Sequence, residues 1–267
     1  MRTRRLTGLG LGLMATVALG VAGCTAGGAT PGAGGSSQTP GAPASSSAAD
    51  PAAAAALGTA AATLGTTSFK ITMTSGPGVK LTGFVDAPGN KGTGTLAITG
   101  PNANIQVKTL LVDQDLYVQV PGITKAGTWT HVDVSRLPAG ANVGLRPGQI
   151  DPANTAKVLT STTDVQKVDS RSYKGTLDLT KVAGITGVDK VTVDGWGAAA
   201  QNVPFTAGLD DQGRLSTLTI QLPAVNGQQS QPLEVLYTDY GTPVTAERPA
   251  AAEITEAPDS LYTTLGG

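Results

Sequence analysis

Cysteine and histidine are almost absent from this sequence. Its 267 residues include one cysteine, Cys24, and one histidine, His131. A single cysteine excludes an intramolecular disulfide framework. Zinc sites are built from clusters of Cys, His and carboxylate ligands, and one histidine with one cysteine argues against such a site. The sequence therefore predicts no metal site and no cofactor.

The residue patterns of catalysis are missing as well. His131 could formally belong to a Ser-His-Asp arrangement, but no G-x-S-x-G elbow occurs anywhere in the chain. Asp210 and Asp211 stand close to Gly213, without the later acidic residues and the terminal Glu of a calcium loop. We predict that the protein is not an enzyme, with no catalytic residue, and that His131 is structural or at the surface.

Charged residues make up only 14% of the chain and aromatic residues 4%. Arg2, Arg4 and Arg5 lie in an N-terminal segment that we expect to be removed. The remaining chain has 15 basic against 19 acidic residues, a net charge of −4, and no basic run. Nucleic-acid binding requires a cationic patch that neutralises phosphates. The sequence predicts no nucleic-acid partner.

A long apolar run is also lacking. The apolar stretch 6–21 is interrupted by glycines and is shorter than the roughly 20 residues of a membrane-spanning helix. It follows three arginines and ends in Leu19-Gly20-Val21-Ala22-Gly23-Cys24, which resembles a bacterial lipobox. We predict a lipoprotein signal peptide over residues 1–23 and lipidation of Cys24, which places the protein on the extracytoplasmic face of the cell membrane. An unmodified cysteine beside a conventional signal is the alternative.

Residues 25–49 contain Gly, Ala, Ser, Thr, Pro and one Gln, with no charge and no large apolar side chain. Such a segment buries too little surface to offset its ordering entropy. We predict that residues 24–49 are a lipidated cysteine and a disordered tether, and that residues 50–267 form one folded domain.

The predicted domain has a β-rich pattern. Asp50-Pro51 predicts the start of a helix over 52–64. Short alternating segments then follow, separated by Gly, Pro and Asn turns. A second helix is expected over 152–159 and a third over 179–188. The strands expected beyond the second helix are 165–168, 173–179, 203–209, 215–222 and 233–237.

Four stretches of the domain carry a resemblance to a known family. They are Leu116-Tyr117-Val118 with Gly127-Thr128-Trp129 and Val132-Asp133, Tyr173 to Leu177, Val203-Pro204-Phe205 with Leu209-Asp210 and Gly213-Arg214-Leu215, and Tyr237 to Val244. With the lipobox and the tether, their order and spacing resemble the LppX/LprA/LprF/LprG group of mycobacterial-type lipoproteins.

The resemblance implies an α+β fold similar to LolA and LolB. This is a single curved antiparallel sheet, or half-barrel, of about 10–11 strands with helices covering its concave face. It also implies an apolar cavity for acylated lipids or lipoglycans, lipid transport in the cell envelope, and an envelope lipid exporter as a partner. Few aromatic residues and many small ones distinguish this chain from the more apolar members.

We expect one face of the sheet to line the cavity. Small residues on that face, Gly83, Ala97, Ala207 and several Thr, would leave room for a ligand. The predicted lining residues are Phe69, Ile71, Val79, Leu81, Val107 and Val118. The alternative is an anchored structural or protein-interaction module whose helices fill this face completely. The volume of the cavity distinguishes the two.

Overall fold

The computed structural model describes residues 49–100, 103–122, 124–137, 145, 150–183, 190–224, 231–260 and 262. They all belong to one compact unit, Ser46–Gly267. The predicted signal peptide, Cys24 and nearly all of the predicted tether lie outside the described residues, and they remain predictions.

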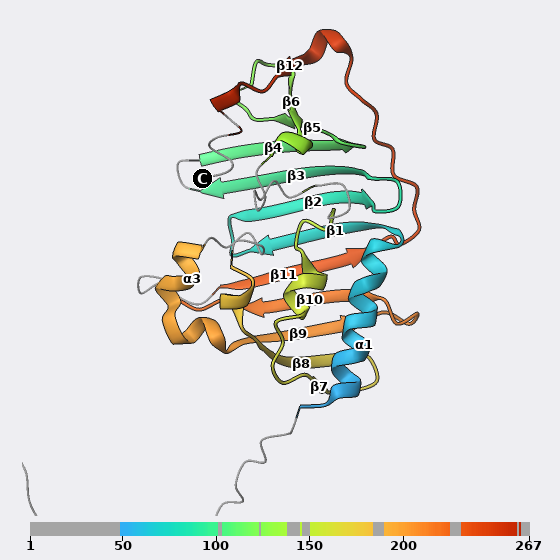
Figure 1. The fold of residues 1–267 in the computed structure, drawn as a ribbon, viewed down its shortest axis with the longest axis vertical. Helices are drawn as coiled ribbons and strands as arrows, with labels where there is room; N and C mark the ends of the chain where they lie inside the picture. The colour runs from blue at the N-terminus through green and yellow to red at the C-terminus, as the bar shows by residue number, and fades with distance from the viewer. Residues whose placement is uncertain are drawn as a thin grey trace, which may run out of the picture. The chain divides into compact units, whose positions relative to one another are not determined.

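The described residues form an α+β fold with one large, open, mostly antiparallel sheet of 12 strands (Figure 1). The strands are ordered β12-β6-β5-β4-β3-β2-β1-β11-β10-β9-β8-β7. The first six are β1 (Ser68–Ser75), β2 (Val79–Asp86), β3 (Lys91–Gly100), β4 (Ala103–Val112), β5 (Asp115–Gln119) and β6 (Trp129–Asp133). The others are β7 (Gln166–Lys167), β8 (Ser172–Leu177), β9 (Val203–Leu209), β10 (Leu215–Gln221), β11 (Pro232–Thr238) and β12 (Ile254–Glu256).

The sheet contains two antiparallel series joined in its middle. Strands β1 to β6 follow one another in sequence and in space, and so do β7 to β11; β1 then pairs with β11. Tight turns make these neighbours adjacent. Between β4 and β5, for example, Asp113 takes the left-handed backbone conformation, with a φ of 57°, that a two-residue hairpin turn requires.

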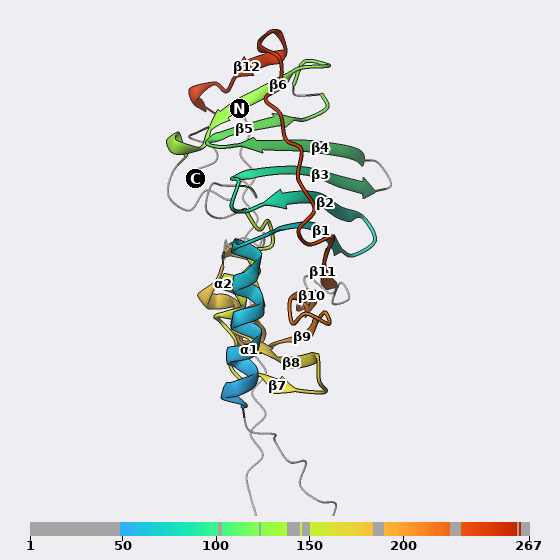
Figure 2. The same ribbon diagram turned by 90° about the vertical axis from the view of Figure 1, so that its right-hand side faces the viewer.

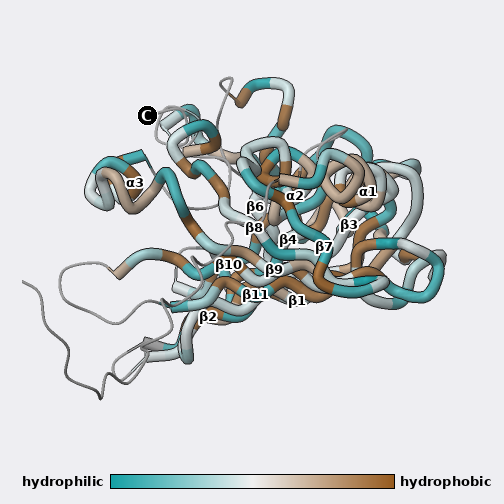
Figure 3. The backbone as a smooth tube through the Cα atoms, turned by 90° about the horizontal axis from the view of Figure 1, so that it is seen from below, coloured by the Kyte–Doolittle hydropathy of each residue, from teal (hydrophilic) through white to brown (hydrophobic). Residues whose placement is uncertain are grey.

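Three helices lie on one side of the sheet, in front of the half formed by β1 and β7 to β11 (Figures 1 and 3). Helix α1 (Pro51–Ala62) begins where the Asp50 carboxylate accepts a hydrogen bond from the Ala52 N–H, as an N-cap does. It buries Ala53, Leu57, Ala60 and Ala61 and packs against α2 (Thr155–Leu159), β7 and β10. Helix α3 is Lys190–Trp196.

The side chains packed against these helices come from one face of the strands. Ile71 pairs with Tyr237 and Met73 with Val235, so their side chains point to the same side of the sheet. Phe69, Ile71 and Tyr237 are almost fully buried there, and the rings of Phe69 and Tyr237 meet edge-on with centroids 5.5 Å apart. The main hydrophobic core therefore lies between the helices and this half of the sheet.

A long connection leaves β11, passes β1 to β4 and reaches the far edge of the sheet, where β12 pairs in parallel with β6 (Figures 1 and 2). Ser68 holds its start, since the Ser68 hydroxyl donates to the Thr242 carbonyl over 2.7 Å. Farther along, Ala246 packs with Leu110 and Tyr117 in a second, smaller hydrophobic cluster. This connection thus carries the C-terminal segment across to the strands farthest from α1.

The expectations for the individual elements have mixed outcomes. The first helix and the strand over 203–209 are confirmed. The sheet has 12 strands rather than 10–11, because the three residues of β12 join its edge without any alternation in their sequence. Helix α2 starts later than predicted, since Asn154 has a φ of 49° and belongs to a turn.

The prediction of a third helix over 179–188 is wrong for its described part. Leu179–Lys181 is a single 3-10 turn, followed by Val182 in a non-helical conformation. Residues 184–189 lie outside the described residues. Within the described ranges, no helix has both the length and the hydrophobicity that a membrane crossing requires.

Candidate functional site

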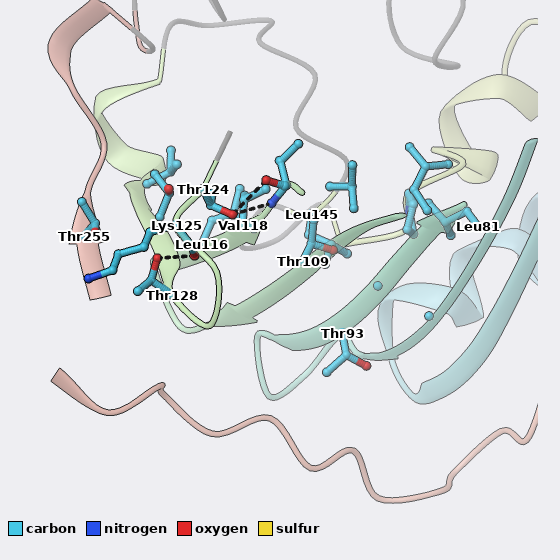
Figure 4. Close-up of a pocket in the computed structure, with 18 of the residues that line it drawn as sticks. Leu81, Thr93, Thr109, Leu116, Val118, Thr124, Lys125, Thr128, Leu145 and Thr255 are labelled. Atoms are coloured by element: carbon cyan, nitrogen blue, oxygen red, sulfur yellow. Dashed lines mark hydrogen bonds between the residues drawn. The ribbon is translucent and has the colours of Figure 1, made fainter. Parts of the chain in front are cut away.

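A cavity of about 720 Å³ lies against strands β2 to β6 and β12, away from the half of the sheet on which α1 packs (Figure 4). This volume is within the range of small-molecule binding sites, roughly 300–1,000 Å³. Most of the residues around it are aliphatic, Gly, Pro or Thr. They are Leu81, Gly83, Thr93, Gly94, Leu96, Val107, Thr109, Leu116, Val118, Val120, Thr124, Lys125, Thr128, Thr130, Val132, Leu145, Pro152, Thr255, Glu256 and Pro258.

The cavity follows one row of directly paired residues across the sheet. Starting at β2, the row is Gly83, Gly94, Thr109, Val118, Thr130 and Thr255, and each residue is the register partner of the next. All six line the cavity. We call them the small-residue row. In the opposite direction the same row continues into Ile71 and Tyr237, whose large side chains fill the space under the helices.

Aliphatic side chains flank the small-residue row on both sides. Leu81, Leu96 and Val107 are register partners on one side of it. On the other side, Leu111 and Leu116 pair in the hairpin of β4 and β5, and Leu116 pairs with Val132. The small-residue row thus lies between two rows of aliphatic side chains. Because its own side chains are short, space remains above it in this half of the sheet.

Two glycines of the small-residue row are needed where the strands come close together. A Cβ atom at Gly83 would lie 2.6 Å from the Thr93 carbonyl oxygen, and one at Gly94 would lie 2.6 Å from the Thr109 hydroxyl oxygen. Both separations are too short for van der Waals contact, so neither position accepts a side chain without movement of its neighbours.

Three of the six predicted lining residues, Leu81, Val107 and Val118, border the cavity. Phe69 and Ile71 point to the same side of the sheet, but they are buried in the main core instead, because the helices cover that part of the sheet. Val79 also faces this side, at the end of β2 and in register with Ile98, and is not among the lining residues. The role of these residues in ligand binding remains a prediction.

The expectation for the small residues was right for Gly83 and wrong for Ala97. Ala97 pairs with Lys80 and Gln106, and its neighbour Leu96 borders the cavity, so Ala97 points to the opposite face. Ala207 is on the expected face but is buried in the main core. Gly94 was missed, and the expected threonines could not be named, since only the cross-strand register brings Gly94, Thr109 and Thr130 into one row with Gly83.

One end of the cavity is bordered by the loop between β5 and β6. The Thr124 hydroxyl donates to the Val120 carbonyl over 2.9 Å and accepts from the Val120 N–H over 3.0 Å. The Thr128 hydroxyl donates to the Lys125 carbonyl over 2.8 Å. These bonds fix the backbone of the loop on either side of Lys125, whose side chain is exposed.

His131 joins the wall of the cavity at β12 to the rest of the sheet. One ring nitrogen, Nε2, is 2.7 Å from an Asp115 carboxylate oxygen, and the other, Nδ1, is 2.8 Å from Glu256. Its ring stacks on Tyr117 with centroids 5.2 Å apart, and Arg248 pairs with the second oxygen of Asp115. Asp115 and Glu256 lie on strands at either side of β6, so the imidazole links three strands.

The two carboxylates favour the charged form of this imidazole. A carboxylate only accepts hydrogen bonds, and a neutral imidazole has one N–H to donate, whereas imidazolium has two. Partial burial opposes the charge on His131, but the hydrogen bonds and charges of Glu256 and Asp115 outweigh it and raise its pKa. Both ring nitrogens are thus engaged, which leaves neither for a serine hydroxyl.

We expect the attachment of β12 to weaken as pH rises. Because the pKa of His131 is raised in the folded protein, its contribution to stability is fully present below the unfolded value of about 6.5 and is lost as pH rises through the folded pKa. Hydrogen–deuterium exchange, corrected for its intrinsic pH dependence, should show decreasing protection of the Ala257 amide, which donates to the His131 carbonyl over 2.9 Å.

Two carboxylate variants separate His131 from the titrating groups near it, Asp133 and Tyr117. Glu256→Gln should remove most of the pH dependence. Asp259→Asn is the matched control, since Asp259 belongs to the same segment but pairs with Arg136 over 2.7 Å. A pH dependence that persists unchanged in Glu256→Gln would show that His131 is not the responsible group.

Among the described residues, no group of three or more His, Cys, Asp or Glu side chains is placed to hold a metal ion.

Comparisons with known proteins identify no family for this chain. No protein-family model matches the chain, and no curated protein matches it.

Proposed function

We propose that this protein is a cell-envelope lipoprotein, anchored through Cys24, that binds or carries acylated lipids or lipoglycans in the cavity over β2 to β6. In this proposal the sheet is a curved half-barrel related to that of LolA, and the helices cover its concave face. The observation that carries the proposal is the cavity itself, with about 720 Å³ between two aliphatic rows.

The free energy of such binding comes from removing hydrocarbon from water. Each buried methylene contributes about 0.8 kcal/mol, so ten methylenes supply roughly 8 kcal/mol. Association costs an estimated 4–15 kcal/mol in lost translational and rotational freedom. Long acyl chains should therefore bind well and short ones poorly, and no reactive side chain is needed.

The dimensions of the small-residue row suit a membrane lipid. From Gly83 on β2 to Thr255 on β12 the row crosses five inter-strand spacings, which at about 4.8 Å each is close to 24 Å. One leaflet of a bilayer contributes half of the roughly 30 Å hydrocarbon core. An acyl chain from such a leaflet and part of its headgroup could lie along the row.

Carriage of a lipid needs no catalysis, and we propose that the protein is not an enzyme. A carrier anchored outside the cytoplasmic membrane would receive its lipid from that membrane, with an envelope lipid exporter as the expected partner. The alternative, an anchored structural or interaction module, needs no space of this size on the sheet, so the cavity volume favours the carrier.

Native mass spectrometry of the full chain tests this proposal. The purified protein should show additional mass corresponding to a bound lipid, and organic extraction should release that lipid for identification. A protein that purifies empty and takes up no lipid from phospholipid vesicles would contradict the carrier proposal.

The anchor has its own test. A radiolabelled fatty acid fed to the producing cells should be incorporated into the wild-type protein and not into Cys24→Ala, because Cys24 supplies the only thiol. Detergent-phase partitioning should change in parallel. Equal labelling of both proteins would remove Cys24 from the proposal.

A further inference from the structure

The two ends of the cavity differ in chemistry. Leu81, Leu96 and Val107 border the end at β2 to β4, and Leu81 lies far from Lys125 and Thr255 in Figure 4. The end at the β5–β6 loop and β12 is bordered by Thr124, Lys125, Thr128 and Thr255. The end at β2 to β4 is thus mainly aliphatic, and the other end has a lysine and more of the hydroxyl groups, as a site for an amphiphile requires.

The polar end has positive character. Two charged residues border the cavity, Lys125 and Glu256. The Glu256 carboxylate lies 2.8 Å from the His131 ring, and its register with His131 and Tyr117 turns it to the face opposite Val118 and Thr130. Lys125 forms no ion pair with any other described residue. Its ammonium group is therefore available to a ligand at this end.

Hydroxyl groups in the cavity wall add hydrogen-bonding capacity, and those of Thr130 and Thr255 belong to strands at the end that Lys125 borders. Thr109, Thr130 and Thr255 belong to the small-residue row, on strands β4, β6 and β12. Unlike those of Thr124 and Thr128, their hydroxyls bond to no other described residue. A hydroxyl can donate to an anionic oxygen and also accept from a sugar hydroxyl.

We propose that the cavity binds an amphiphile with an anionic headgroup, a carboxylate or a phosphate, held at Lys125 and the threonines of β6 and β12. Its acyl chain lies toward Leu81, Leu96 and Val107. This inference rests on the proposed function and specifies its ligand class and the direction in which the ligand lies. The opposite direction would desolvate the charge among Leu81, Leu96 and Val107, away from Lys125 and from the threonines of β6 and β12, which is unfavourable.

Three ligands with the same chain and different heads test this inference. We would measure the affinity of the full chain carrying Cys24→Ala, which removes its own acyl anchor, for dodecanoate, dodecanol and dodecylamine below their aggregation concentrations. The protein with an unchanged cavity should bind dodecanoate most tightly and dodecylamine most weakly. Lys125→Gln should weaken dodecanoate binding about tenfold, as expected for one charge-assisted hydrogen bond, and should leave dodecanol within about twofold.

Lys108→Gln is the matched control, because Lys108 is exposed on β4 next to Val107 and on the opposite face. It should change none of the three affinities, whereas Lys125→Arg should keep the preference for dodecanoate. Equal binding of all three ligands, or an equal effect of Lys125→Gln and Lys108→Gln, would overturn the headgroup assignment and leave the carrier function standing. If none of the three ligands binds, the proposed function itself fails.

Discussion

Val118→Trp is expected to abolish lipid binding while the fold remains stable. Val118 lies in the middle of the small-residue row, between Thr109 and Thr130, and its side chain is only partly buried. An indole at this position would occupy the space above Gly94 and Thr109. Filling an existing cavity need not strain the core, whereas adding volume to a packed core costs about 1–3 kcal/mol.

The measurement combines lipid content with thermal unfolding. The variant should lose the co-purifying lipid, and its affinity for a long-chain ligand should fall by at least tenfold, equivalent to 1.4 kcal/mol or more. Its melting temperature in the absence of lipid should be close to that of the lipid-free wild type.

Tyr117→Trp is the matched control for this result. Tyr117 is the neighbour of Val118 and points to the opposite face, where it is 1% exposed and packs with Leu110 and Ala246. Overpacking there should lower stability without removing lipid. If Val118→Trp destabilised the protein and left the lipid bound, the cavity would not be the binding site.

The sequence allowed much of the sheet to be predicted, because the signal for a strand is local. The alternation in Val203–Leu209 indicated both its limits and its buried face. A strand's two faces differ every second residue, so Leu81, Val107 and Val118 could be assigned to one side of the sheet without knowing which strands are neighbours.

The cavity could be predicted only in part, because it depends on register between strands. Gly83, Gly94, Thr109 and Thr130 are distant in sequence, and nothing in their local patterns shows that they align. Phe69 and Ile71 have the same alternation as Leu81, but α1 and α2 pack over them. Which part of a face the helices cover is a property of the whole fold.

The contacts of His131 with Asp115 and Glu256 could not be predicted from the sequence for the same reason. Ile254–Glu256 is too short to show a strand pattern, and it pairs in parallel with β6, more than a hundred residues earlier in the chain. His131 was expected to be structural or at the surface. Its partners could be identified only once the C-terminal segment was placed at the edge of the sheet.

The largest loss of stability is expected from Asp151→Ala. The Asp151 carboxylate accepts hydrogen bonds from the Ala153 N–H over 3.0 Å and the Thr155 N–H over 2.7 Å, and from the Tyr237 hydroxyl over 3.3 Å. The alanine variant would leave two buried backbone donors without an acceptor, each at a cost of about 1–3 kcal/mol. We expect a decrease of roughly 2–4 kcal/mol in the free energy of unfolding, measured by urea denaturation.

Conservative variants should show how much of this loss comes from the backbone donors and how much from the Tyr237 hydroxyl. Asp151→Asn keeps one acceptor oxygen but turns an amide N–H₂ toward a second donor, so its effect should be intermediate. Tyr237→Phe should lower the free energy of unfolding by about 1 kcal/mol, since the Ala153 and Thr155 N–H groups still donate to the Asp151 carboxylate. Equal effects of Asp151→Ala and Tyr237→Phe would show that the hydroxyl, rather than the backbone turn, is what Asp151 stabilises.

The same carboxyl group should also contribute to the pH dependence of stability. Burial raises the pKa of Asp151, although its hydrogen bonds act in the opposite direction. A raised folded pKa means that this contribution is fully present below the unfolded value, about 3.9, and is lost as pH rises through the folded pKa. Asp151→Asn should remove this part of the slope, and a slope equal to that of the wild type would assign it to another group.

Ligand linkage separates Asp151→Ala from Val118→Trp. Pro152 is the one cavity-lining residue in the turn that Asp151 stabilises, so the alanine variant should keep most of the cavity wall but fold less stably. A ligand that binds only the folded state adds RT ln(1 + [L]/Kd), about 2.7 kcal/mol at a hundredfold excess over Kd. Added lipid should therefore raise the melting temperature of Asp151→Ala and have no effect on Val118→Trp. A rise in both variants would mean that the lipid stabilises the fold from outside the cavity.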